Sequence, residues 1–316
     1  MDNIKFNNSP KIKAKILKVI KSPYILVVPA FLFYLIFWAY PVLTAIYEVF
    51  TKVSTEGGGF TLNNIVALVN EVHFSEALVN SLVFAIVSII LQFILALLLA
   101  LLINRKFKGS NLFLFFMMLP MAIPIASVGI IWNTGLTEFG WINSLLEVTG
   151  LQNILELVGL ADGPIIWTTV SGMKAVMFLI LVDTWTVLPS VMIIILAGLQ
   201  NLNKEYQEVA MVFGATKRQT ITDIVIPIIK PTIITALLLR IISGIQIWLL
   251  SVMIFGFNKV PFLVERIVYY TKFYYSDESA DKLAFTYSVL VIIIVMTMAV
   301  LFLQANKKSE RSMNNG

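Results

Sequence analysis

The chain alternates between long apolar runs and short polar connections. A helix needs about 20 mostly apolar residues to cross a hydrocarbon layer about 30 Å thick. Runs such as 88–103 do not alternate between apolar and polar residues, which excludes the strands of a membrane barrel. We therefore expect an all-α polytopic membrane protein. Its six predicted transmembrane helices are 24–48, 78–103, 111–133, 175–199, 231–256 and 283–304.

Composition supports a membrane protein and narrows the chemistry that the chain can perform. Of 316 residues, 59% are hydrophobic and 13% are charged, whereas soluble domains have about 45–50% and 25%. A water-soluble fold or a disordered chain is therefore excluded. The chain has no cysteine and one histidine, His73, which leaves little catalytic chemistry for a membrane enzyme. We expect no metal or cofactor to be bound by this chain.

The net charge of +5 reflects membrane topology, because the basic residues flank the apolar runs. We expect no nucleic acid partner. Sixteen lysines and arginines lie in the N-terminal tail, the second and fourth connections and the C-terminal tail. The opposite side has only Lys52, Lys259, Arg266, Lys272 and Lys282. The positive-inside rule then predicts that both termini are cytoplasmic.

The predicted organisation has three parts: a basic tail of residues 1–23, a six-helix domain of 24–304 and a cytoplasmic tail of 305–316. The first tail has apolar residues at helical spacing, which fits a helix lying on anionic lipid as well as a simple topology determinant. Two outer loops, 49–77 and 134–174, are longer than the other connections. In the second, the apolar spacing suggests short surface helices.

The cytoplasmic connection 200–230 is too polar to span the membrane. Asn203 can cap a helix that ends at Gly214, the residue best suited to a left-handed turn. A capping box at 216–219 then starts a second helix, which we expect Pro227 and Pro231 to close. Two short helices at a glycine bend suit docking into a groove of a partner protein.

One motif in this connection carries a family resemblance. Glu208-Val209-Ala210 is followed after three residues by Gly214, after nine more by Ile224, and after one more by Ile226-Pro227. This spacing resembles the EAA motif of ABC importer permeases. Three identities depart from that motif: Val209 replaces Ala, Ile226 replaces Leu, and Phe213 stands where an acid often precedes Gly-Ala.

Two other spans resemble the sugar-permease branch that contains the maltose and glycerol-phosphate transporter subunits. The third span has Leu119-Pro120, Pro124 and Trp132, and the fourth has Asp183-Thr-Trp185 and Pro189. The likeness covers residues 80–304. It departs after the fifth span, where the branch often has a Gly-Gly-Pro loop that this chain lacks.

The resemblance implies a type I ABC importer permease in the cell membrane. The chain has no phosphate-binding loop, so ATP and Mg would be bound by a separate ABC ATPase dimer. It also implies a second permease subunit, expected to be a related sister chain, and an extracytoplasmic solute-binding protein. The residues that it implies for coupling to the ATPase are Glu205, Glu208, Val209, Ala210, Phe213, Gly214 and Ala215.

Charged residues inside spans are costly, and they are usually functional or paired. Asp183 and Arg240 lie at similar depths, so they form either a structural ion pair or part of the solute path. The resemblance adds aromatic and polar candidates that contact solute or serve only in packing. The complete set for the solute path is Trp132, Asp183, Trp185, Ser190, Arg240, Gly244 and Gln246.

The leading function is therefore a permease subunit for import of a carbohydrate. The same machine for a sugar phosphate or polyol is the nearest alternative, and a secondary transporter without an ATPase is a second. A secondary transporter would need its own coupling-ion site and often has inverted repeats, and neither is evident in the sequence.

Overall fold

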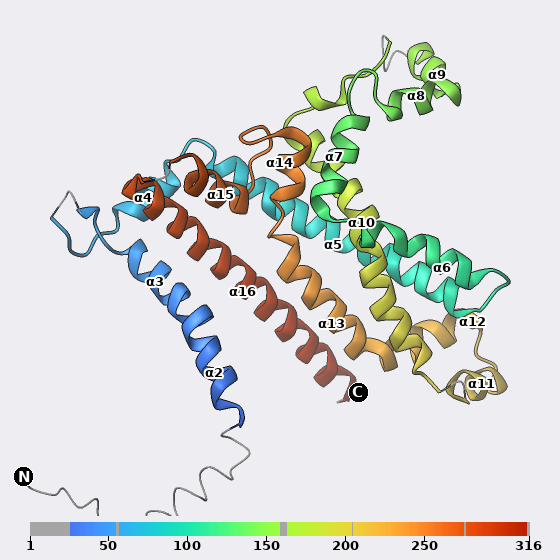
Figure 1. The fold of residues 1–316 in the computed structure, drawn as a ribbon. Coiled ribbons are helices and arrows are strands. Elements are labelled where there is room, and N and C mark those ends of the chain that lie inside the picture. Colours follow the sequence, from blue (N-terminus) through green and yellow to red (C-terminus); the bar gives the residue numbers. More distant parts are fainter. Residues whose placement is uncertain (1–25, 55–56, 159–162, 204, 275, 315–316) are drawn as a thin grey trace, which may run out of the picture.

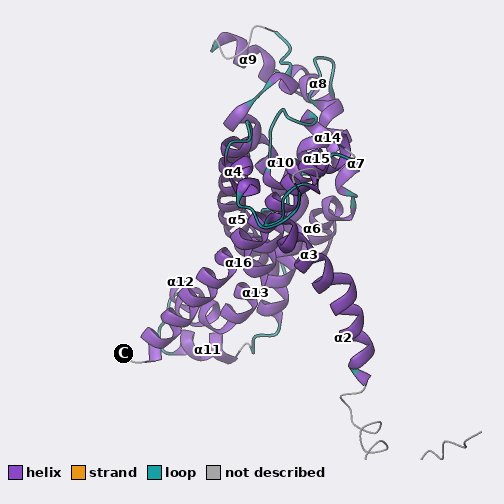
Figure 2. Ribbon diagram, turned by 90° about the vertical axis from the view of Figure 1, so that its left-hand side faces the viewer, coloured by secondary structure: helices purple, strands orange, loops and turns teal. Residues whose placement is uncertain are grey.

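The computed structural model describes residues 26–54, 57–158, 163–203, 205–274 and 276–314. The tail of 1–23 and its amphipathic pattern lie outside these residues. Apart from loops and one isolated bridge between Thr51 and Phe60, the described chain is helical (Figures 1 and 2). The elements are α2 (Val28–Tyr34), η2 (Leu35–Ala39), α3 (Tyr40–Val49), α4 (Asn63–Val69), α5 (Phe74–Asn104), α6 (Ser110–Met118), η4 (Leu119–Ala122), α7 (Ile125–Gly135), α8 (Trp141–Val148), α9 (Leu151–Leu157), η5 (Trp167–Thr169), α10 (Gly172–Gln200), α11 (Glu205–Val212), α12 (Lys217–Gln219), η6 (Thr220–Val225), α13 (Ile226–Gly244), α14 (Leu249–Phe255), α15 (Leu263–Phe273) and α16 (Glu278–Asn314).

Five helical segments of the described chain are long and apolar enough to cross a membrane. A sixth is added if the bent pair α6–η4 and α7 counts as one span, in agreement with the predicted number. Helices α4, α8, α9 and α15 lie at one end of the bundle, and α11 and the C-terminal end of α16 lie at the other (Figure 1). The expected short surface helices of the second outer loop are α8 and α9.

The predicted third span, 111–133, is not one continuous helix. Segments Ser110–Ala122 and Ile125–Gly135 meet at an angle of 92°. Pro124 is in an extended conformation and caps α7, and Pro120 lies in the 3-10 turn before it. Proline removes a backbone donor and restricts the residue before it, so two prolines four residues apart break the helix. By contrast, α10 continues through Pro189.

The predicted limits of the fifth span, 231–256, are wrong at both ends. Helix runs without interruption from Lys217 to Gly244, so Pro227 and Pro231 do not close it. The turn before Pro227 is the π-helical segment η6, and this wider turn changes the hydrogen-bond register ahead of the proline ring. The helix instead ends at Gly244, and an irregular stretch of four residues precedes α14.

The centre of the bundle is the pair of long helices α5 and α10. Ala96 and Ala100 of α5 are fully buried against residues such as Met192 and Ile195 of α10. Small side chains at such an interface let two membrane helices approach closely. The same cluster includes Ile233 of α13, so the three helices share one core beside α11.

The first span lies apart from this core, as both ribbon views show (Figures 1 and 2). Most of its large apolar side chains are exposed, and only 6% of its most apolar window is buried in the chain. Lys282 of α16 ties it to the bundle: the ammonium group donates to Glu48 Oε2 at 2.8 Å and to Thr51 Oγ1 at 2.9 Å. This span therefore depends on contacts outside the chain for most of its burial.

A buried charge cluster holds the end of the bundle that contains α4 and α15. Arg266 Nη2 donates to Glu71 Oε1 at 2.9 Å, and the Tyr287 hydroxyl donates to Glu71 Oε2 at 2.7 Å. Glu265 is 1% exposed; one carboxylate oxygen accepts from the Asn258 amide at 3.1 Å, and the other has no hydrogen-bond partner among the described residues. Burial raises the pKa of Glu265. The cluster joins the connection before α5 to α15 and α16.

Candidate functional site

Two regions contain the residues singled out from the sequence. The first is the bend between α11 and α12. Asn203 Oδ1 accepts from the Glu205 amide at 3.1 Å and so caps α11. At the other end of α11, the Ala215 amide donates to Ala210 O and the Gly214 amide to Met211 O, both at 3.0 Å. This pair of bonds is a Schellman motif.

Glycine is required at this bend because Gly214 has φ of +85°. The next helix starts at once: the Gln219 amide donates to Thr216 Oγ1 at 3.3 Å, and the Thr216 amide donates to Gln219 Oε1 at 2.9 Å. This is the predicted capping box. The bend is thus held by backbone hydrogen bonds and a cap at each side, and α11 projects from the bundle in a defined direction.

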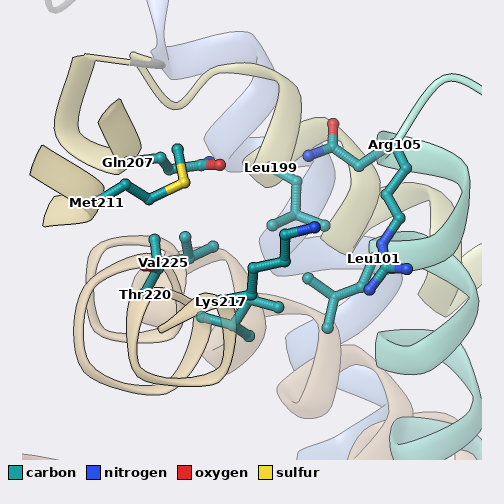
Figure 3. A pocket seen from close by; sticks show the side chains of 10 residues that line it. Leu101, Arg105, Leu199, Gln207, Met211, Lys217, Thr220 and Val225 are labelled. Carbon is teal, nitrogen blue, oxygen red and sulfur yellow. The ribbon is translucent and has the colours of Figure 1, made fainter. Parts of the chain in front are cut away.

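The two faces of α11 differ. Ala210 is buried, while Gln207 and Met211 point into a cavity of about 270 Å³ (Figure 3). Leu199 of α10 lines the same cavity, together with residues of α5 and of the helix after the bend. The rest of α11 and its tip are exposed and carry several large apolar side chains. Glu205, Glu208, Val209, Val212 and Phe213 are all exposed, and Ala215 is half-buried.

A second, more polar cavity of about 640 Å³ adjoins the first. Arg105 and Lys106, from the connection after α5, and Glu208 of α11 line it. Arg105 and Lys217 also line the first cavity. The segment that carries the sequence motif is therefore bordered by two cavities that contain polar groups, and it is not packed tightly against the core.

The second region is a buried polar cluster within the candidate spans. Arg240 of α13 forms an ion pair with Asp183 of α10, through Nη2 and Oδ2. Gln92 of α5 bridges the two: its Nε2 donates to Asp183 Oδ2 at 2.7 Å and its Oε1 accepts from Arg240 Nε at 2.5 Å. Arg240 also donates to the hydroxyls of Ser88 at 3.0 Å and Ser243 at 3.1 Å.

The ion pair borders a cavity of about 280 Å³. The irregular stretch between α13 and α14 forms part of its wall, with Gln246 and Trp248 among the lining residues. Irregular backbone at membrane depth is tolerated where it lines a cavity or is covered by protein. The break at Gly244 therefore exposes polar groups to the same space that the Asp183–Arg240 pair borders. The sequence left open whether the pair is structural or borders a solute path, and the geometry is compatible with both, because the pair is formed and also borders a cavity.

The remaining candidates are divided between this region and its surroundings. Gln246 lies in the cavity wall, and Gly244 packs against Ala85 of α5, where an added Cβ would lie 3.7 Å from the alanine Cα. Ser190 is not among the residues that line the cavity; its hydroxyl donates to Val187 O at 2.7 Å.

Trp132 and Trp185 form a separate aromatic group with ring centroids 6.0 Å apart. Phe178 and Trp141 lie 5.6 and 5.4 Å from Trp132. The buried Trp132 Nε1 has no hydrogen-bond partner among the described residues, while Trp185 is 40% exposed. The four rings pack together, and the indole N–H of Trp132 is a hydrogen-bond donor without a partner among the described residues.

Three polar residues of the cluster were missed by the sequence reasoning: Ser88, Gln92 and Ser243. Gln92 carries the clearest signal, because it is the one amide in the long apolar run 81–103. A polar residue inside a span is usually paired or functional. Its role becomes evident only when α5, α10 and α13 are brought together.

Comparison with known proteins gives the family. A family model described as "Binding-protein-dependent transport system inner membrane component" matches residues 92–314. The chain belongs to this family. It is therefore a multi-pass membrane component of a transport system and not an enzyme, and it has the all-α fold of ABC importer permeases.

Named relatives and a solved structure agree with this assignment. The chain is 24% identical over 211 residues to the trehalose/maltose transport system permease protein MalF of Thermococcus litoralis, with 65% of each chain covered. It is 27% identical over 299 residues to the arabinooligosaccharides transport system permease protein AraP of Bacillus subtilis, covering 92% of this chain and 90% of AraP. A chain in the crystal structure of a bacterial alginate ABC transporter, in complex with alginate pentasaccharide-bound periplasmic protein, matches with a TM-score of 0.74 and 22% identity. That match covers 95% of this chain and 96% of the other.

Proposed function

We propose that this chain is one of two permease subunits of an ATP-driven importer for a carbohydrate. The observation that carries the proposal is the α11–α12 bend, whose residues have the spacing of the importer coupling motif and which projects as a capped, exposed helix. The cavity that Asp183 and Arg240 border lies between α5, α10 and α13, within the spans, where a solute path is needed. A secondary transporter would give no reason for this bend.

The carbohydrate assignment rests on the relatives. Their names refer to trehalose/maltose and to arabinooligosaccharides, and the alginate transporter imports an acidic polysaccharide. These proteins share a solute class but differ in sugar and in charge. We therefore assign import of a carbohydrate to this chain, and the names of the relatives leave the charge of that carbohydrate open.

The missing phosphate-binding loop and the exposed apolar surfaces of the chain indicate which partners it needs. Its sequence has no phosphate-binding loop, so ATP and Mg are bound by a separate ATPase dimer. The exposed apolar surface of α2 and α3 supports burial against lipid and a sister permease. An extracytoplasmic binding protein delivers the solute at the end that carries α8, α9 and α15. The end with α11 faces the cytoplasm, and both termini lie on that side.

Coupling requires that closure of the ATPase dimer changes the packing of the permease between two states. In our proposal Val209, Val212 and Phe213 enter a groove of the ATPase, with Glu208 beside them. The rigid Schellman bend at Gly214 passes their displacement to the helix that begins at Lys217. That helix carries Arg240 and ends at the cavity, so one continuous helix connects the bend beside the docking surface with the solute path.

The deciding experiment is purification of the tagged chain in a mild detergent, with partners identified by mass spectrometry and ATP hydrolysis measured on the eluate. We expect an ATPase and a second permease. Recovery of the chain alone, with no ATP hydrolysis, would refute the importer and favour a secondary transporter.

Reversing the charge of Glu208 tests whether this residue couples the permease to the ATPase. Glu208→Arg should abolish uptake in the complete transporter while the binding protein still captures solute. Asp223→Arg is the matched control, since Asp223 is also exposed in the same connection but lies outside the Glu208–Gly214 part of the motif. Equal uptake by the two variants would count against a coupling role for Glu208.

A further inference from the structure

The cavity beside α13 is lined mostly by apolar side chains, with a few polar groups and no unbalanced charge. Of the residues that line it, only Asp183 and Arg240 are charged, and they are paired with each other. The other polar lining residues include Ser243 and Gln246, which are neutral. The described part of the chain therefore offers a solute hydrogen-bonding groups but no net charge.

Arg240 is largely occupied by other partners. Its Nε and Nη2 donate to Gln92 and Ser88 in addition to the ion pair with Asp183, and its Nη1 donates to Ser243. A guanidinium group has five N–H donors, and four are used in these bonds. An anionic solute would have to displace the Asp183 carboxylate, which is held by Gln92 as well as by the ion pair.

Asp183 also disfavours an anion directly. Its Oδ2 accepts from both Arg240 and Gln92, whereas its Oδ1 makes no bond to another described residue, and the residue lines the cavity. A free carboxylate oxygen accepts hydrogen bonds from hydroxyl groups but repels a carboxylate, sulfonate or phosphate. The side chains of Ser243 and Gln246 can both donate to and accept from hydroxyls.

We propose that the solute crossing at this cavity is an uncharged carbohydrate, which the cavity recognises through hydrogen bonds to its hydroxyl groups. Acidic sugars and sugar phosphates are excluded. This inference rests on the proposed import function and specifies its substrate class. Selection against charge arises because a buried anion would have no counter-charge here, and an uncompensated charge is costly away from water.

The chain has no cysteine, so a thiol introduced at Gln246 can report the charge of the cavity. The complete transporter carrying Gln246→Cys is treated with three methanethiosulfonates of similar size: neutral hydroxyethyl, anionic sulfonatoethyl and cationic trimethylammonioethyl. Labelling of this chain is followed by intact mass, and each rate is divided by the rate of the same reagent with free 2-mercaptoethanol.

The expected result is that the neutral reagent reacts fastest and that the anionic and cationic rates agree within about threefold. Adding Asp183→Asn leaves Arg240 without its counter-charge. The anion-to-cation ratio should then rise at least about tenfold, because the uncompensated guanidinium attracts the anionic reagent and repels the cationic one. A change in thiol reactivity alone would affect both charged reagents and cancel in the ratio.

A thiol at Val212, 85% exposed on α11, is the matched control and should show no change in ratio with Asp183→Asn. Faster reaction of the anionic than the neutral reagent at position 246, in the chain that retains Asp183, would overturn the inference. It would indicate a net positive cavity suited to an acidic sugar. This readout needs no knowledge of the solute, and it uses a variant that retains the ion pair.

Uptake into proteoliposomes gives the second measurement. Each neutral sugar is paired with its aldonate, for example maltose with maltobionate and lactose with lactobionate. Uptake of any aldonate at a rate within threefold of its neutral partner would refute exclusion of charge while leaving the importer intact. Absence of an associated ATPase would instead refute the import function, whatever the labelling ratio.

Discussion

Replacing Asp183 with leucine would leave the Arg240 guanidinium buried without a counter-charge. The two side chains are only 10% and 4% exposed, so water can solvate the remaining charge only weakly. Removing one partner of a buried ion pair costs about 3–5 kcal/mol of stability. We expect Asp183→Leu to lower the free energy of unfolding by this amount and Arg240→Met to have a similar effect.

The double variant Asp183→Leu/Arg240→Met should lose less than either single variant, about 2 kcal/mol or less. It leaves no charge uncompensated, and apolar replacements of buried pairs are often close to neutral. The resulting coupling energy between the two positions would exceed about 3 kcal/mol, which is large for a pair of side chains. Most of the stability lost in each single variant would therefore come from the buried charge that is left without a counter-charge.

The assay is reversible unfolding in mixed micelles at increasing fractions of sodium dodecyl sulfate, followed by tryptophan fluorescence. Asp223→Leu is the control, because Asp223 is exposed and its replacement should change the unfolding free energy by about 0.5 kcal/mol or less. If the loss in the double variant equals the sum of the single losses, Asp183 and Arg240 do not act as a unit and the argument from their geometry fails.

Three further predictions concern other parts of the chain. Because the pKa of Glu265 is raised by burial, its contribution to stability is complete below its ordinary pKa of 4.5 and is lost as the pH rises through the raised value. Thermal unfolding between pH 4.5 and 8 should show this slope, and Glu265→Gln should flatten it where Glu147→Gln does not; an unchanged slope would refute the assignment. Gly129→Ala places a Cβ against Met253 and should cost about 1–3 kcal/mol in the same unfolding assay, whereas the neighbouring Ser127→Ala should be tolerated. Gly214→Val cannot adopt φ of +85° without strain of about 1–2 kcal/mol and should reduce capture of the ATPase in a pull-down; Gly214→Asn, which tolerates this conformation, should retain it, and equal capture by both would contradict the proposal for the bend.

The local structure that short-range chemistry determines could be predicted from the sequence. The bend at Gly214 and the capping box at Thr216 and Gln219 formed as expected, because caps and left-handed glycines depend on residues within one turn. The number of spans was also predictable, since each needs only length and apolarity. The positions of Asp183 and Arg240 along their helices were enough to suggest that the two could meet.

Tertiary context decided the features that the sequence did not reveal. Pro227 was expected to end a helix, but the π-helical turn before it lets the helix continue. Gly244 was expected within a span, but it ends one where the chain turns to line a cavity. The partners Gln92 and Ser88 lie about 150 residues from Arg240 in sequence, and no local pattern links them to it.

The unbroken helix from Lys217 to Gly244 has a mechanical consequence. Its 28 residues span about 42 Å at 1.5 Å per residue. It starts at the α11 bend and ends at the cavity wall. A pivot of about 5° at the bend moves the far end of a rod of this length by about 4 Å, enough to pull a hydrogen-bonded group out of contact. In the proposed importer, small displacements of α11 are therefore magnified at Arg240 and Gly244, and the stiffness of this one helix determines how much of that movement reaches the cavity.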